Sequence, residues 1–208
     1  MASGKHWEWR GFGSLSPALA RRLEALPLKF ASAQELTDEY LWAPGCTGNV
    51  KLRLGDLKFK RSIERSGGLE RWLEDPSENY AFPLQARVLD ALALDLNILL
   101  PGVGRGPVTR EALLDLVRRA DPPVQLVAVK KRRWQREWDS GGAGGPITVE
   151  VAEISSPERT TSVGIEHADR ARVEEARDAF GLAEALQGMS YLEALPLWAA
   201  GRTLANRW

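Results

Sequence analysis

The chain has 208 residues, with 28 Lys and Arg residues balanced by 28 Asp and Glu residues, so its formal net charge is zero. This balance excludes an overall positive field that would draw the protein to nucleic acid or to a membrane surface, and any basic site must be local. The single cysteine, Cys46, excludes an intramolecular disulfide and a cysteine-based zinc site. The length suits one domain, residues 1–208, with a helical insertion.

Apolar segments of the chain are short. The first ten residues, MASGKHWEWR, lack the apolar stretch of a secretory signal, and the longest apolar run, ALALDLNILLPGV, is interrupted by Asp95 and ended by Pro101. We therefore expect a soluble, cytoplasmic protein.

The first predicted strand covers residues 6–12, where polar and aromatic residues alternate with a period of two. Its polar face carries His6, Glu8 and Arg10. Residues 16–26 follow with the spacing of a short amphipathic helix, for which Ser16 is the expected N-cap and Pro17 the first helical residue. Residues 36–44 predict a second strand, which leads through a Gly-containing loop into a hairpin.

That hairpin, residues 49–60, places basic residues on one face and apolar residues on the other. The basic face carries Lys51, Arg53, Lys58 and Lys60. With Gly55 and Asp56 as the turn, Arg53 lies opposite Lys58 and Lys51 opposite Lys60, and like charges in such pairs are destabilising. Something anionic, either acidic side chains or a ligand, is expected on this face. The alternative is a solvated face or an edge protected by lysine.

The second half of the chain returns to strands after a different segment. Residues 62–124 predict a mainly helical insertion, in which Thr109 is a plausible N-cap. Strands are then expected at 124–138, 147–154 and 160–167, the first two forming a second hairpin, before a helix at 168–182 that ends at Gly181 and a tail of short helical turns.

The second hairpin also gathers cations, and its register is open. Either Lys131 and Arg133 or Lys130 and Arg132 lie on the face that carries the site. The two following strands carry the acids Glu150 and Glu166. A sheet curved to enclose these faces would form a charged cavity. Its cations could bind a phosphate chain, and its carboxylates could hold Mg²⁺ or Mn²⁺. The alternative is that the carboxylates only form salt bridges with neighbouring cations.

These motifs, in this order, resemble the CYTH, or triphosphate tunnel metalloenzyme, superfamily. HWEWR stands in the place of the family's E-x-E-x-K strand, with Glu8 as the second acid and His6 in the place of the first. NVKLR, LKFK and KKRRW resemble its basic strands, and the pair Arg133-Trp134 selects the register with Lys131 and Arg133 inside. TVEVAE resembles the strand with one acid, where Glu150 matches best and Glu153 is second choice. SVGIEHAD resembles the E-x-E strand, with Glu166 as the second acid and Gly164 replacing the first.

The resemblance implies an α+β fold built on an eight-stranded antiparallel β-barrel, a tunnel open at both ends, with flanking helices and an insertion at about 62–124 that covers the barrel or recognises a substrate. It implies a metal-dependent triphosphatase acting on a triphosphate-containing small molecule or polyphosphate, with Mg²⁺ or Mn²⁺ and with no nucleic acid or membrane partner. The acids Glu8, Glu150 and Glu166 would bind metal and serve catalysis. The phosphate-binding residues would be Arg10, Lys51, Arg53, Lys58, Lys60, Lys131 and Arg133.

The departures at His6 and Gly164 leave phosphate binding better supported than catalysis. The alternatives are a non-catalytic polyphosphate- or nucleotide-binding module, a class IV-type adenylate cyclase, and a scaffold whose charges pair internally.

Overall fold

The computed structural model describes residues 4–102, 106–141 and 144–204. The strands, in chain order, are β1 (Gly4–Gly13), β2 (Gln34–Trp42), β3 (Gly48–Arg53), β4 (Asp56–Ser66), β5 (Leu69–Glu74), β6 (Asn79–Tyr80), β7 (Gln125–Trp138), β8 (Ile147–Ser156), β9 (Thr160–His167) and β10 (Gln187–Gly188). The helices are α1 (Pro17–Glu24), the 3-10 turn η1 (Pro76–Glu78), α2 (Ala86–Leu96), α3 (Arg110–Arg118), α4 (Arg170–Phe180), α5 (Leu182–Ala185) and α6 (Tyr191–Ala199).

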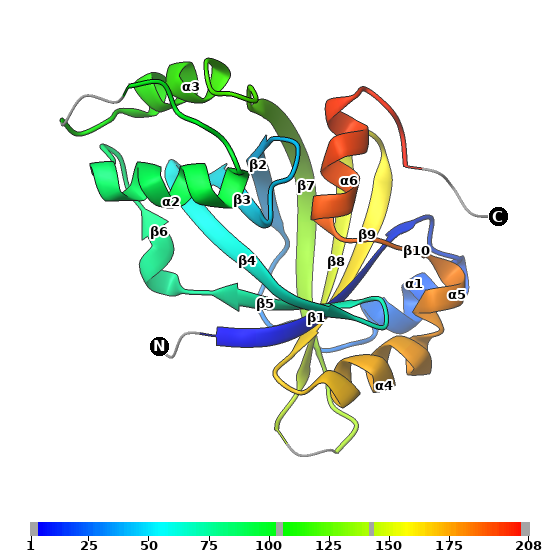
Figure 1. Ribbon diagram of the computed structural model, residues 1–208. Coiled ribbons are helices and arrows are strands. Elements are labelled where there is room, and N and C mark those ends of the chain that lie inside the picture. The colour runs from blue at the N-terminus through cyan, green and yellow to red at the C-terminus, as the bar shows by residue number, and fades with distance from the viewer. Residues whose placement is uncertain (1–3, 103–105, 142–143, 205–208) are drawn as a thin grey trace.

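Within the described ranges, eight strands close into an antiparallel barrel in the order β1-β5-β4-β3-β2-β7-β8-β9, and β9 pairs back with β1 (Figure 1). The two-residue strands β6 and β10 add to β4 and β1. The expected α+β fold with an eight-stranded antiparallel barrel is therefore confirmed. Closure removes the open sheet edges that would otherwise pair with other chains.

The helix ends follow local sequence signals. The Ser16 hydroxyl accepts a hydrogen bond from the Leu19 amide (3.2 Å), and the Thr109 hydroxyl accepts one from the Ala112 amide (3.3 Å), so both residues are N-caps as expected. Helix α4 ends at Gly181, whose φ of 65° is the left-handed conformation that favours glycine. In the described part of the chain, no helix is both long enough and apolar enough to cross a membrane.

The β3–β4 hairpin turns one residue earlier than expected. Leu54 and Gly55 form the turn with φ of 53° and 90°, the two positive angles of a type I′ turn, in which glycine suits the second position. The Leu54 side chain is 83% exposed instead of joining the apolar face. Lys51 consequently lies opposite Lys58, and Arg53 lies opposite Asp56. One pair of facing lysines remains.

The start of the segment 62–124 is not helical. Residues 62–66 complete β4 and residues 69–74 form β5, which pairs with β1 inside the barrel wall. Gly67 and Gly68, with φ of 60° and 78°, make the turn between them. Helices appear only later in the segment, as α2 and α3, which cover the apolar outer faces of β3 and β4.

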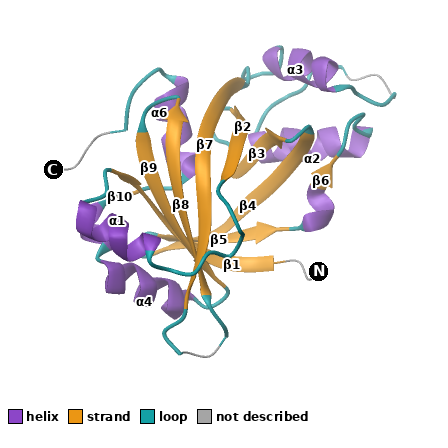
Figure 2. Cartoon of the chain, turned by 180° about the vertical axis from the view of Figure 1, so that it is seen from behind, coloured by secondary structure: helices purple, strands orange, loops and turns teal. Residues whose placement is uncertain are grey.

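The barrel is apolar outside and charged inside. Trp7 and Trp9 point outward from β1 and pack with Leu19 and Leu23 of α1 and with Val173 of α4. Figure 2 shows α1 and α4 on one side of the barrel and α2 and α3 at another end. The helices thus bury the apolar outer face of the strands, while the charged face lines the interior of the barrel.

One end of the barrel is filled by α6. Tyr191 and Trp198 of this helix pack against Phe12, Tyr40 and Val129, which point inward from β1, β2 and β7. The Phe12 and Tyr191 rings meet edge to face at 5.4 Å between centroids. Aromatic side chains therefore pack into this end of the barrel.

Candidate functional site

The charged faces of the strands enclose an inner chamber of about 250 Å³. The residues that the sequence placed at a site and that line this chamber are Glu8, Arg10, Lys51, Arg53, Lys60, Lys131, Arg133, Glu150 and Glu166. Lys58 lies on β4 nearer the β3–β4 turn and is not part of the lining. The exposed Glu153, the second choice for an acid, lines a groove outside the barrel.

The open register of β7 is settled by burial. Lys131 is 4% exposed and lies inside the barrel beside the ring of Tyr191, with 4.9 Å from its Nζ to the ring centroid. Arg132 is exposed on the outer face, where its guanidinium lies 4.9 Å from the Trp134 ring. The inward residues are therefore Lys131 and Arg133.

Glu8 is the centre of a buried ion-pair network. Its Oε1 lies 2.7 Å from Nε of Arg10, and its Oε2 lies 2.6 Å from Nζ of Lys60. Burial raises the pKa of the Glu8 carboxyl, but Lys60 and Arg10 outweigh this effect and hold that pKa far below its usual value. Lys60 also approaches Glu166 at 3.8 Å. Glu8 therefore stays ionised, and its charge is shared between two cations.

Glu150 is bound by two arginines. Its Oε1 lies 3.1 Å from Nη1 of Arg10, and its Oε2 lies 3.0 Å from Nη1 of Arg133. Burial opposes the charged form, yet Arg10 and the neighbouring cations lower the pKa of Glu150 below its usual value. Glu150 thus orients the two guanidiniums in the chamber.

Asp38 of β2 is a site residue that the sequence patterns did not identify. It is fully buried, forms a bidentate hydrogen-bonded pair with Arg53, and lies 3.2 Å from Nζ of Lys131. Burial raises its pKa, but Lys51, Arg53 and Lys131 together hold it well below its usual value. Aspartate is depleted in strands, so its place in QELTDEYLW between Leu36 and Tyr40 was the signal available in the sequence.

Lys51 is the cation that the acids do not neutralise. No carboxylate oxygen of the described residues lies within 4.0 Å of its Nζ, whereas each of the other lysines lining the chamber has such a partner. Burial, with the charges of Arg53 and Lys131, lowers the pKa of Lys51 to about 7, although Asp38 opposes this. The chamber therefore has more positive charge than its own carboxylates compensate at this point.

Gly164 leaves room for the guanidinium of Arg10 in the chamber. It lies directly opposite Arg10 on the neighbouring strand, and a Cβ added there would lie 2.5 Å from Nη2 of Arg10. The guanidinium occupies the space that an acidic side chain would need. At this position the chamber therefore holds a cation, which binds Glu8 and Glu150.

His6, Glu8 and Glu166 form a group that could hold a metal ion, because one donor atom from each lies within 4.8 Å of the others. The Nε2 atom of His6 is buried and has no hydrogen-bond partner in the described residues. An imidazole nitrogen with two carboxylates suits a divalent cation such as Mn²⁺. Glu8 and Glu166 of the expected metal set belong to this group, whereas Glu150 lies outside it.

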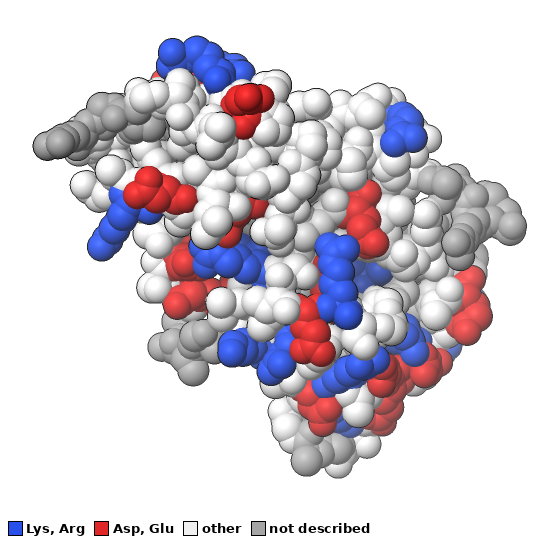
Figure 3. Space-filling view, in the orientation of Figure 1, with Lys and Arg blue, Asp and Glu red and all other residues white. Residues whose placement is uncertain are grey.

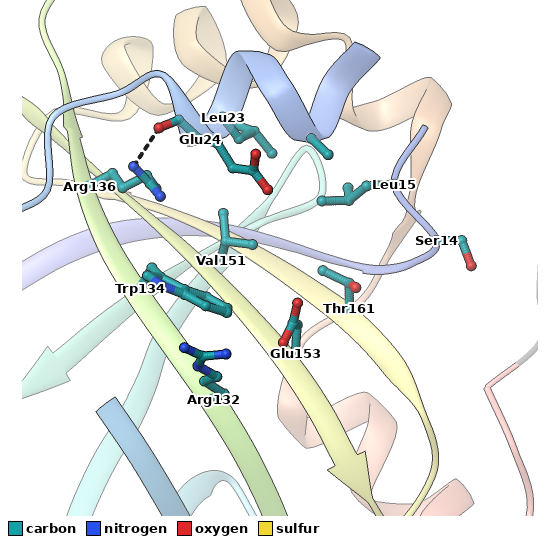
Figure 4. Close-up of a pocket in the computed structure, with 11 residues that line it drawn as sticks. Ser14, Leu15, Leu23, Glu24, Arg132, Trp134, Arg136, Val151, Glu153 and Thr161 are labelled. Atoms are coloured by element: carbon teal, nitrogen blue, oxygen red, sulfur yellow. Dashed lines mark hydrogen bonds between the residues drawn. The ribbon is translucent and has the colours of Figure 1, made fainter. Parts of the chain in front are cut away.

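A larger cavity, of about 650 Å³, lies outside the barrel beside α1 (Figure 4). Its floor is formed by Trp134 and Val151, and its Arg136 donates hydrogen bonds of 2.7 Å to the carbonyls of Glu24 and Leu26. Arg136 is thus already bound to two carbonyls, and Arg132, the other cation of the lining, lies over the Trp134 ring. We therefore place the candidate site in the inner chamber. Over the face in Figure 3, charges of both signs intermingle, in agreement with a local basic site.

No family model and no curated protein sequence matches the chain. Among solved structures, a conserved hypothetical protein from Pyrococcus furiosus superimposes with a TM-score of 0.51 at 15% identity, covering 90% of this chain and 98% of that one. A protein from Pyrococcus horikoshii gives 0.49 at 16% identity, with 89% and 98% covered. A protein from Bacillus halodurans, described as a candidate adenylate cyclase, gives 0.40 at 14% identity, with 86% and 91% covered. The first likeness supports the fold and nothing finer.

Proposed function

We propose, from a barrel with the architecture of the CYTH, or triphosphate tunnel, superfamily, that this protein binds the phosphate chain of an inorganic or organic triphosphate in its inner chamber and hydrolyses it with the help of a divalent cation. The observation that carries the proposal is Lys51, a partly buried lysine without a carboxylate partner among the described residues, beside Arg53 and Lys131. Such a cluster is stabilised by an anion, and a phosphate chain supplies several negative charges in a row.

The arginines suit the geometry of phosphoryl oxygens. Arg53 and Arg133 present planar guanidiniums that are held in position by Asp38 and Glu150. A fixed guanidinium can donate two hydrogen bonds to one phosphate without first losing side-chain entropy. We assign binding of the chain to Arg53, Lys51, Lys131 and Arg133, and stabilisation of charge at the phosphoryl group under attack to Arg10.

His6, Glu8 and Glu166 would hold the divalent cation, which when bound polarises a phosphoryl oxygen and lowers the pKa of a bound water. Lys60 and Arg10 neutralise Glu8 in this structure. With the cation in place, these two side chains would be free to donate hydrogen bonds to phosphoryl oxygens. Glu8 and Glu166 would thus pair with cationic side chains in the ligand-free state and with the divalent cation in the bound state.

The test is release of orthophosphate from tripolyphosphate, ATP and thiamine triphosphate, with Mg²⁺, with Mn²⁺ and with chelator. We expect metal-dependent release that Glu166→Gln abolishes while leaving binding of tripolyphosphate within about tenfold. Glu184→Gln, at an exposed carboxylate of α5, is the matched control and retains activity. Release that persists in chelator, or that Glu166→Gln leaves unchanged, contradicts the assignment.

A non-catalytic binding module is the second candidate, and one observation favours it. The carboxylates Glu8, Glu150 and Glu166 each lie within 4.0 Å of a chamber cation, so all three have a structural role without metal. Tight binding of tripolyphosphate without phosphate release, in the presence of either metal, would establish this candidate. Formation of cyclic AMP from ATP would instead establish a cyclase.

A further inference from the structure

The segment between α1 and β2 extends the barrel wall beyond the start of β2. The Lys29 amide donates a hydrogen bond to the Gln135 carbonyl (2.9 Å), and the Glu137 amide donates one to the Pro27 carbonyl (2.9 Å). Residues 27–29 therefore pair with β7 as a short antiparallel segment. Both bonds join backbone atoms, so a change of the Lys29 side chain leaves them in place.

The register of this pairing turns the Lys29 side chain towards the barrel interior. Leu28 lies directly opposite Arg136, which lines the larger cavity outside the barrel. Lys29 therefore lies opposite Gln135, which lines the inner chamber. Directly opposite residues have their side chains on the same face of a sheet, and neighbours along a strand point to opposite faces. Lys29 thus belongs to the inner face, although the sequence patterns did not assign it to the site.

The amine of Lys29 crosses the inner face of β7 and reaches β8. Its Nζ donates a hydrogen bond of 3.1 Å to Oγ1 of Thr148. Thr148 lies directly opposite Glu166, an acid of the candidate metal group. Within the ranges that the structure describes, no carboxylate oxygen lies within 4.0 Å of the Lys29 amine. We call the end of the barrel at these three residues the mouth, and its amine has a charge that no acid there compensates.

The mouth is the direction in which a phosphate chain can lengthen. At the other end of β8, roughly 20 Å from Thr148, Ile154 packs with the aromatic side chains of α6. The inner chamber also adjoins a second cavity of about 310 Å³, whose lining includes Glu70 and Glu193. Arg65, which also lines that cavity, is already paired with Glu70 at 2.5 Å. Carboxylates repel phosphates, so a further phosphoryl group is accepted at the mouth.

We infer that Lys29 binds the third phosphoryl group of a chain, counted from the inner end, and so makes the site prefer a triphosphate to a diphosphate. The first two groups are held by Lys51, Arg53 and Lys131. In the ligand-free protein the amine binds the Thr148 hydroxyl, and phosphoryl oxygens, as charged acceptors, form the stronger hydrogen bond. This inference rests on the part of the proposed function in which the inner chamber binds phosphates, and it does not require hydrolysis.

The experiment measures binding of pyrophosphate and of tripolyphosphate by calorimetry, with chelator present so that neither metal nor turnover contributes. Lys29→Met keeps the length of the side chain and removes its charge. We expect it to weaken tripolyphosphate binding about fivefold, as for one hydrogen bond at an exposed site, and to leave pyrophosphate within about twofold. Lys29→Arg should keep the preference for tripolyphosphate. Lys130→Met, at an exposed lysine of β7, is the control and should change neither affinity.

A second variant separates phosphate binding from a purely structural role of the Lys29 side chain. Thr148→Val removes the hydroxyl that binds the amine in the ligand-free protein and keeps the shape of the side chain. It should leave the affinity for tripolyphosphate undiminished, because the amine remains available to the anion. The same loss in Thr148→Val as in Lys29→Met would overturn the inference, since the contact between the two side chains would then be what matters.

Equal losses for both anions in Lys29→Met would also overturn the inference, as would an unchanged affinity for tripolyphosphate. Its failure remains distinct from that of the proposed function. If the wild type prefers tripolyphosphate and Lys29→Met keeps this preference, the inference falls and phosphate binding stands. If the wild type releases no phosphate from any substrate but Lys29→Met loses the preference, the inference stands and the hydrolysis falls. A wild type that binds neither anion would refute both.

Discussion

Replacing Asp38 by asparagine should separate the structural role of the buried charges from their role in binding. Asp38 is fully buried and neutralises Arg53 and Lys131, whose side chains are 14% and 3% exposed. Removing one member of a buried ion pair leaves its partners uncompensated, which costs about 3–5 kcal/mol of unfolding free energy. With a urea m-value of roughly 3 kcal/mol per M for a chain of this size, the unfolding midpoint should fall by about 1–2 M.

The same variant should gain more from a phosphate chain than the wild type does. In Asp38→Asn, tripolyphosphate can neutralise the cations that have lost their carboxylate partner. Its addition should therefore raise the unfolding midpoint of Asp38→Asn by more than it raises that of the wild type. Urea unfolding followed by tryptophan fluorescence, with and without tripolyphosphate, measures both effects. Asp90→Asn, at an exposed acid of α2, is the control. A midpoint unchanged in Asp38→Asn, or an equal response to tripolyphosphate in both proteins, would refute the reasoning.

The remaining predictions concern protons, metal and packing. Because the pKa of Lys51 is lowered to about 7, this amine is largely neutral at pH 8 in the free protein and takes up a proton when tripolyphosphate binds; calorimetry in two buffers of different ionisation enthalpy should show this uptake in the wild type and lose it in Lys51→Arg, whereas identical uptake in both proteins would rule it out. His6→Glu should shift the affinity ratio from Mn²⁺ towards Mg²⁺, since it replaces an imidazole by a carboxylate; an unchanged ratio in calorimetry would remove His6 from the metal site. Gly164→Ala should displace the guanidinium of Arg10 from Glu150 and weaken tripolyphosphate binding by roughly 10–100-fold, as expected for the loss of a charge-assisted hydrogen bond; full affinity would mean that Arg10 relaxes without cost.

The barrel could be predicted because its strands alternate charged and apolar residues. In an ordinary sheet the apolar face marks the core, and here it marks the outer layer that helices cover, as with Trp7 and Trp9. The order of the basic pairs along the sequence therefore indicated a charged interior without knowledge of which strands pair. The turn at Leu54-Gly55 was missed because a leucine rarely adopts positive φ, and tertiary pairing decided the register.

The site was less predictable, because its remaining members depend on contacts across the barrel. Asp38 and Glu70 lie in strands without the alternating basic residues that marked β3, β4 and β7, and only the pairing of β2 with β7 and of β5 with β1 brings them to the charged rows. That Gly164 stands where the motif it resembles has an acid was visible in the sequence. Its reason, the guanidinium of Arg10, required the structure.

Strand β5, in the segment after residue 62, was also not predicted from the sequence. Glu70, Trp72 and Glu74 alternate towards the barrel interior, but the run is short and lies next to Gly67-Gly68 and to the helical residues that follow. A short strand in such surroundings gives a weak period of two. The pairing with β1 and β4, which the sequence does not display, stabilises it.

The central claim is that the inner chamber binds a chain of phosphates. The most direct measurement is calorimetric titration of orthophosphate, pyrophosphate and tripolyphosphate, each into the wild type and into Arg53→Ala, with chelator present so that metal plays no part. We predict that affinity rises with each added phosphoryl group in the wild type, and that Arg53→Ala removes most of this rise. Equal, weak binding of all three anions, unchanged in the variant, would show that the buried cations serve only to pair with the chain's own carboxylates.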